Sequence, residues 1–119
     1  QGLIFYKAFF RYLDYQILEE SNEHVAASDG SIDFWVMQTE SAHAHRTFHR
    51  KGTGINHLAF QLASRVAVDS FVNDFLLPRG VTPLYGSPKV YPEYAADYYA
   101  VYFEDPDRIK LEVMARAGA

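Results

Sequence analysis

Two side chains on separate apolar segments of the sequence could bind a metal ion together. His57 lies in GINHLAFQL and Glu112 in RIKLEVM, and both segments are expected to be strands. Side chains alternate in direction along a strand, so His57 and Gln61 share the face opposite their apolar neighbours, and Glu112 takes the equivalent face of its own strand. Imidazole and carboxylate are ligands for Zn, Mn, Fe, Co or Ni, and such an ion polarises the oxygens of a bound substrate.

The same two residues also allow an interpretation without a metal. His57 would then be a hydrogen-bonded residue of a pocket, and Glu112 would pair with Lys110 or Arg108. Two ligands do not complete a metal site. The pattern of residues therefore leaves both interpretations open.

A second mixed face is expected in the segment SIDFWVMQ. Asp33, Trp35 and Met37 alternate with apolar residues that would face a helix, so these three side chains would line a polar and aromatic wall. Asp33 could act as a general base there, although a surface aspartate in an ion pair is the simpler interpretation. We expect the three residues, together with Gln61, to contact a small-molecule ligand.

Other histidines and tyrosines gather in two loops. His43, His45 and His49 stand in a segment with no apolar stripe and no intervening carboxylate, so a structural or solvated role is expected. Arg50, which follows them, is expected to be a surface charge. The tyrosines at 91, 94, 98 and 99 could form a lid over a substrate or a packed dimer surface.

Helices and strands are expected in a repeated order along the sequence. The first half reads as a helix and three strands, and the second half as a strand, a helix and three strands. The spacing predicts helices over 3–13 and 64–80 and strands over 15–20, 24–28, 31–38, 55–62, 81–86, 98–105 and 108–114, with a loop over 87–97. We therefore expect an α+β fold of two βαβββ modules, the first without its opening strand, whose two similar sheets lie side by side and form a cupped, partly open mixed sheet. Residues 1–119 would make a single domain: module one over about 1–40, a linker over 41–53 and module two over 54–116.

GINHLAF and YYAVYFEDPDRIKLEVM, separated by a helix, resemble the second module of the vicinal oxygen chelate superfamily. This superfamily contains glyoxalase I, fosfomycin and bleomycin resistance proteins and extradiol dioxygenases. The resemblance implies a dimer with a divalent metal in the cup, held by residues of the first strand of each module and the last strand of the second. It assigns His57 and Glu112 as metal ligands, and Tyr102 resembles a substrate-facing tyrosine of the fosfomycin resistance branch.

The sequence departs from the family pattern in its first module. The first-strand histidine would lie before Gln1, so a third ligand is expected there or from a partner chain. Trp35 stands where Glu112 stands in the second module, and tryptophan is not a metal ligand. The resemblance thus implies a metal-dependent lyase, isomerase, transferase or dioxygenase. The alternative is a metal-free, drug-sequestering protein of the bleomycin-resistance type, with Trp35 and Tyr102 in an aromatic groove.

The composition limits the chemistry, the partners and the cellular location that are expected for this chain. The chain has 119 residues, 49% of them hydrophobic, no cysteine and a net charge of −4. These values exclude a thiol nucleophile or a disulfide framework and argue against a nucleic-acid partner. No apolar run is long enough for a membrane span, and no secretory signal is recognisable. We expect a cytoplasmic homodimer that binds a small molecule.

Overall fold

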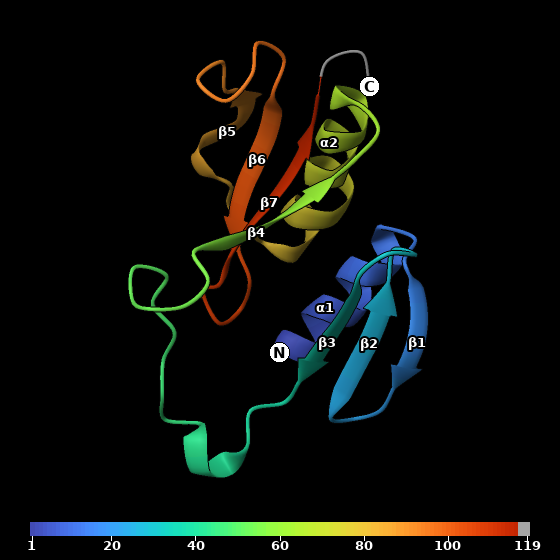
Figure 1. Cartoon of the computed structure of the whole chain (residues 1–119), viewed down its shortest axis with the longest axis vertical. Coiled ribbons are helices and arrows are strands. Elements are labelled where there is room, and N and C mark those ends of the chain that lie inside the picture. The colour runs from blue at the N-terminus through green and yellow to red at the C-terminus, as the bar shows by residue number, and fades with distance from the viewer. Residues whose placement is uncertain (117–119) are drawn as a thin grey trace. The chain divides into compact units, whose positions relative to one another are not determined.

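The computed structural model describes residues 1–116. The chain divides into two compact units, Gln1–Thr47 and Phe48–Ala119 (Figure 1). Each unit combines helix and sheet, which confirms the predicted α+β class. The assignment of both modules to a single domain stays a prediction. No helix in the described range is long and apolar enough to cross a membrane.

The first unit is a helix packed on a three-stranded antiparallel sheet. Helix α1 (Gly2–Tyr12) is followed by β1 (Gln16–Glu20), β2 (His24–Ser28) and β3 (Asp33–Met37), paired in the order β1-β2-β3, and by the short 3-10 helix η1 (Ser41–His43). Phe9 and Phe10 of α1 are fully buried, and the Phe10 ring stacks on Phe34 of β3 with 5.7 Å between centroids. The helix predicted over 3–13 is confirmed.

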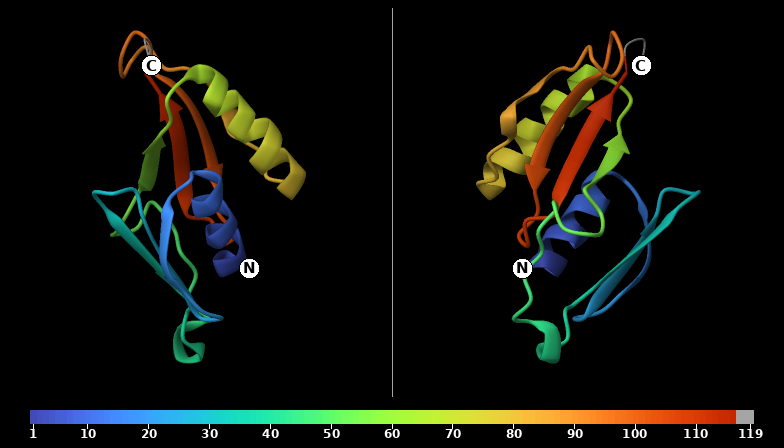
Figure 2. Two further views of the ribbon diagram at one scale, coloured as in Figure 1. Left: turned by 90° about the vertical axis from the view of Figure 1, so that its right-hand side faces the viewer. Right: turned by 60° about the vertical axis from the view of Figure 1, so that its left-hand side comes forward.

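The second unit has the complete βαβββ order. Its strands are β4 (His57–Gln61), β5 (Leu84–Val90), β6 (Tyr99–Glu104) and β7 (Lys110–Ala115). They form a sheet in the order β4-β7-β6-β5, in which β4 and β7 are parallel and the other neighbours antiparallel (Figure 2). The mixed sheet predicted for this module is confirmed.

The helical segment of the second unit changes its winding along its length. It runs as α2 (Arg65–Phe71), the π-helix η2 (Val72–Leu76) and the 3-10 helix η3 (Leu77–Arg79). Ser64 caps its start by accepting a hydrogen bond from the Ala67 backbone N–H at 3.1 Å, and Gly80 ends it in a left-handed conformation (φ 72°). The predicted helical range is confirmed, but the π and 3-10 segments have no counterpart in the prediction.

The predicted short strand over 81–86 and loop over 87–97 are wrong in their boundaries. Strand β5 extends to Val90, and its pairing with β6 shifts register between Leu84 and Lys89. Ser87 spans the irregularity: its hydroxyl donates to the Leu84 carbonyl at 2.6 Å and accepts from the Tyr102 N–H at 3.0 Å. A bulge of this kind breaks the alternation on which strand prediction depends, and Pro88 adds a loop signal.

The core of the second unit lies between the helix and one face of its sheet. Phe71 is fully buried, its ring 5.2 Å from that of Phe75 and 5.5 Å from that of Phe103 on β6. Leu111 and Val113 of β7 are also fully buried. Because side chains alternate along β7, this packing leaves Lys110, Glu112 and Met114 on the opposite face, as predicted.

Replacing Phe71 by alanine should lower the free energy of unfolding by about 3–5 kcal/mol, because the cavity removes packing against two rings. Leu77→Ala is the control, since Leu77 is 54% exposed and its truncation should cost under about 1 kcal/mol. Urea denaturation measures both. Equal losses in the two variants would contradict this description of the core.

Candidate functional site

The face of the second sheet away from the helix gathers polar and aromatic side chains in rows across the strands. Strand β7 lies between β4 and β6, so its residues 110–114 have a neighbour on both sides. One row is His57, Lys110 and Glu104; the next is Ala59, Glu112 and Tyr102. Neighbours in a row point to the same side of a sheet. His57 also reaches Glu112 in the next row, 55 positions along the chain.

His57 and Glu112 form the centre of this face. His57 Nε2 lies 3.1 Å from Glu112 Oε1, and His57 Nδ1 lies 2.8 Å from Asn56 Oδ1. The Glu112 side chain is only 2% exposed, whereas the His57 side chain is 34% exposed. Adjacent ligand atoms on a metal with bonds of about 2.0–2.2 Å lie about 3 Å apart, so these two atoms fit neighbouring coordination positions. The same distance also fits a direct hydrogen bond.

Glu112 takes its second partner from the tyrosine-rich loop. Tyr98 donates its hydroxyl hydrogen bond to Glu112 Oε2, so each oxygen of the buried carboxylate has a donor. Burial of the phenol, reinforced by this hydrogen bond, raises the pKa of Tyr98 well above its usual range. The predicted pairing of Glu112 with Lys110 or Arg108 is wrong, because this carboxylate bonds to His57 and Tyr98 instead.

Tyr102 forms one wall beside this pair. Its ring is 5% exposed and meets the His57 ring edge-on, with 5.9 Å between centroids. Burial and the negative charge of Glu112 raise the pKa of Tyr102 above the usual range, so its hydroxyl stays protonated. Tyr91 packs edge-on against Tyr102 at 5.3 Å, and its buried hydroxyl has no hydrogen-bond partner within residues 1–116.

Lys110 sits beside His57 without a carboxylate partner among the described residues. Its neighbour in the row, Glu104, binds Arg50 instead, with 2.6 Å between Arg50 Nη1 and Glu104 Oε2. The Lys110 ammonium lies 4.9 Å from the centroids of both the Tyr85 and the Tyr102 rings. A hydrogen bond from Lys110 is the main cause that lowers the pKa of Tyr85 below its usual range.

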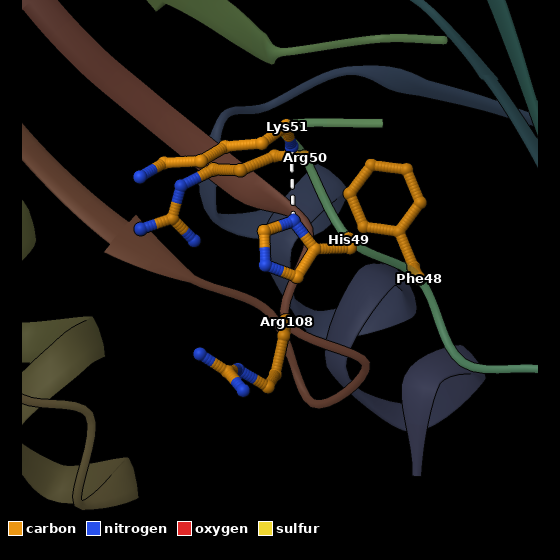
Figure 3. A pocket seen from close by; sticks show the side chains of 5 residues that line it. All are labelled: Phe48, His49, Arg50, Lys51 and Arg108. Atoms are coloured by element: carbon orange, nitrogen blue, oxygen red, sulfur yellow. Dashed lines mark hydrogen bonds between the residues drawn. The ribbon is translucent and has the colours of Figure 1, made fainter. Parts of the chain in front are cut away.

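A basic cavity of about 220 Å³ opens next to Arg50. It is lined by Phe48, His49, Arg50, Lys51 and Arg108 (Figure 3). The side chains of Arg50, Lys51 and Arg108 extend toward the same side of the cavity. No carboxylate is among its lining residues, although Glu104 binds Arg50 and lies 3.7 Å from Arg108 Nε.

The remaining predicted ligand contacts lie in different places. Gln61 is exposed on β4, two positions beyond Ala59 and on the same face as His57. Asp33, Trp35 and Met37 share one exposed face of β3 in the first unit, with Trp35 56% and Met37 70% exposed. A common pocket for residues of both units stays a prediction.

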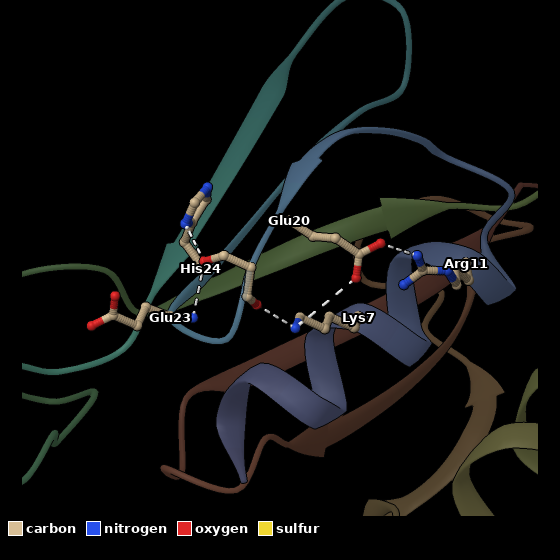
Figure 4. Close-up of polar contacts among 6 residues, drawn as sticks. Lys7, Arg11, Glu20, Glu23 and His24 are labelled. Atoms are coloured by element: carbon tan, nitrogen blue, oxygen red, sulfur yellow. Dashed lines mark hydrogen bonds and ion pairs between the residues drawn. The ribbon is translucent and has the colours of Figure 1, made fainter.

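His24 of the first unit is engaged in local contacts. Its ring stacks on Trp35 with 6.1 Å between centroids, and its two nitrogens lie 2.8 Å from Ser21 Oγ and 2.7 Å from Glu19 Oε1. The neighbouring carboxylate of Glu20 binds Lys7 and Arg11 of α1, which ties β1 to the helix (Figure 4). Across residues 1–116 there is no cluster of three or more histidine and acidic side chains that could hold a metal.

The sequence did not predict the roles of three residues at the site. Arg50 was expected to be a surface charge, but its contact with Glu104 joins residues 54 positions apart and leaves no local signal. Tyr98 was assigned only to a lid or a dimer surface. The direction of the Tyr85 side chain cannot be predicted from strand alternation. It is set by the bulge in β5, where Tyr85 has a positive φ of 61°.

Known proteins share this fold. The chain is 30% identical over 112 residues to the uncharacterized protein YqjT of Bacillus subtilis strain 168, covering 93% of this chain and 85% of YqjT. A crystal structure of a glyoxalase candidate from Bacillus halodurans superposes with a TM-score of 0.83 at 35% identity, covering 96% of this chain and 84% of that one. FosX from Listeria monocytogenes, solved with Mn(II) and sulfate, gives a TM-score of 0.62 at 20% identity, covering 94% of this chain and 79% of FosX. No family model matches the sequence.

The fold and these relatives define the class of protein. The chain belongs to the vicinal oxygen chelate superfamily, the class of glyoxalases, bleomycin resistance proteins and FosX, as the motifs around His57 and Glu112 predicted.

Tyr98→Phe should lower the free energy of unfolding by about 1–3 kcal/mol, because it leaves one oxygen of a buried carboxylate without its donor. Tyr94→Phe is the matched control: Tyr94 is 63% exposed and no hydrogen bond of its hydroxyl is found among the described residues. Thermal and urea unfolding compare the two. A Tyr98→Phe variant as stable as Tyr94→Phe would show that Tyr98 does not support Glu112.

Proposed function

We propose that this protein binds a small molecule with vicinal oxygens at the second-unit sheet face, and that His57 and Glu112 hold a divalent metal there. The observation that carries the proposal is the 3.1 Å separation of His57 Nε2 and Glu112 Oε1, with the carboxylate buried and the imidazole open to solvent. A buried carboxylate next to an accessible imidazole is a common basis of metal and catalytic sites.

A third protein ligand must come from outside this pair. Residues 1–116 offer no cluster of three candidate ligands, so the metal would complete its coordination with a further protein ligand and with the substrate. We expect a partner chain to supply the third ligand. Zn, Mn, Fe, Ni and Co all suit imidazole and carboxylate ligands, so the donor atoms do not select one of them.

The residues of the chain prepare the site for a substrate in defined ways. A bound divalent ion would act as a Lewis acid that polarises the substrate oxygens. Tyr98 holds the Glu112 carboxylate in one orientation, as hydrogen-bonded partners do for metal ligands. Tyr102 stays protonated beside the pair, so its hydroxyl can donate to a developing negative charge on the substrate. Polarisation of substrate oxygens fits a lyase, isomerase, transferase or dioxygenase reaction.

A metal-free binding protein is the second candidate. Both oxygens of Glu112 already accept hydrogen bonds, one from His57 and one from Tyr98, so the carboxylate is satisfied without a cation. The rings of Tyr85, Tyr91 and Tyr102 would then bind an apolar or aromatic ligand by contact alone. This function predicts ligand binding that is independent of metal.

Two further expectations belong to this proposal. We expect a homodimer, since a partner chain can contribute the missing ligand, and a cytoplasmic location. Size-exclusion chromatography with light scattering, with and without added metal, tests the first. A dimer that forms or tightens with metal would support a ligand shared between chains.

Removing either proposed ligand should weaken metal binding. We expect His57→Ala and Glu112→Gln to reduce the affinity for Mn(II) or Zn(II) at least about tenfold, measured by isothermal titration calorimetry on chelator-treated protein. His45→Ala is the matched control, because His45 is exposed in the linker. Equal affinity in all four proteins would contradict the site, and an unchanged affinity for the small-molecule ligand in metal-free protein would favour the second candidate.

A further inference from the structure

The strongest unassigned feature is the cationic group of side chains next to the His57–Glu112 pair. Lys110 is half-buried on β7, one strand away from His57 in the same row. Its other neighbour in that row, Glu104, is already bound by Arg50, so Lys110 is a cation facing two aromatic rings and no acid within the described chain. The two rings contact this ammonium by cation–π interaction, and its positive charge stays available to an anion.

Tyr85 supplies a donor at the same place. Its ring lies 5.6 Å from the Tyr102 ring, and the Lys110 ammonium lies 4.9 Å from the Tyr85 ring centroid. The hydroxyl of Tyr85 can therefore donate a hydrogen bond to an anion held next to Lys110. The positive φ of Tyr85 in the β5 bulge aims this side chain at the sheet face.

The basic cavity extends this group outward from Arg50. Arg50, Lys51 and Arg108 line it (Figure 3). Of these, Arg50 and Arg108 both contact the carboxylate of Glu104, the strand neighbour of Lys110. This region is locally positive, although the whole chain has a net charge of −4. A concave surface of one charge sign attracts a ligand of the opposite sign.

We infer that Lys110 and Tyr85, with Arg50 behind them, form an oxyanion-binding subsite for the carboxylate or phosphate group of the ligand. The subsite adjoins His57 through the Tyr102 ring, which contacts Lys110, Tyr85 and His57. An anion held there would place the neighbouring oxygens of the same molecule at the His57–Glu112 pair. The inference rests on the proposed function for the reacting end of the ligand, and it narrows the substrate class to organic anions.

The test measures anion binding in metal-free protein. Inorganic phosphate and acetate are titrated separately into chelator-treated wild type at low ionic strength, with calorimetry or amide NMR shifts as the readout. Lys110→Met keeps most of the side-chain stem and removes the charge, and it should weaken binding of the preferred anion about fivefold or more. Lys89→Met is the matched control, because Lys89 is also a lysine above a tyrosine ring, that of Tyr91, but is exposed on β5. It should bind like wild type.

Tyr85→Phe provides a second variant that leaves the charge intact. Tyr85 is 52% exposed, so its replacement should leave the core intact. The loss of its hydroxyl should lower the affinity for the anion about twofold or more. The phosphate and acetate arms distinguish the two sources of the oxyanion. No saturable binding of either probe, or equal affinity in wild type and Lys110→Met, would overturn the inference. Because no metal is present, this result is independent of whether His57 and Glu112 bind one.

Discussion

The burial of the Glu112 carboxylate is the constraint on which the rest of the site depends. A carboxylate that is 2% exposed must have a donor or a cation at each oxygen, or its burial would destabilise the fold by several kcal/mol. His57 and Tyr98 meet this need from a parallel strand and from a loop. The burial of Glu112 therefore depends on the mixed sheet that brings His57 next to it and on the tyrosine-rich loop that provides Tyr98.

The central position of β7 makes this arrangement possible. Because β7 pairs with β4 on one side and β6 on the other, its outward residues meet His57, Tyr102 and Glu104 in successive rows. The helix covers the other face through Phe71 and its neighbours, which leaves this face free for polar groups. Arg50 neutralises Glu104 and so leaves Lys110 next to His57 as an unpaired cation in the described unit. The apolar core therefore lies on one face of this sheet, and the polar and charged side chains lie on the other.

Local periodicity was enough to predict the parts of the molecule that obey it. The helical spacing in α1 and the alternation in β4 and β7 predicted the helix, the strands and the common face of His57 and Glu112. The bulge of β5 was missed because it breaks the period of two between Leu84 and Lys89. Contacts such as Tyr98 to Glu112 and Arg50 to Glu104 join distant positions through loops, and no spacing rule encodes them. A single sequence therefore gives the two central residues and not the groups that support them.

Anomalous diffraction from crystals of the protein soaked in Mn(II) tests the proposed metal site most directly. A metal held by His57 and Glu112 would give an anomalous peak between His57 Nε2 and Glu112 Oε1, at about 2.0–2.3 Å from each, with Tyr98 still bonded to the other carboxylate oxygen. A peak at other histidines, or a direct His57–Glu112 hydrogen bond that persists at saturating metal, would contradict the metal site. It would leave the tyrosine-walled face as a metal-free ligand pocket.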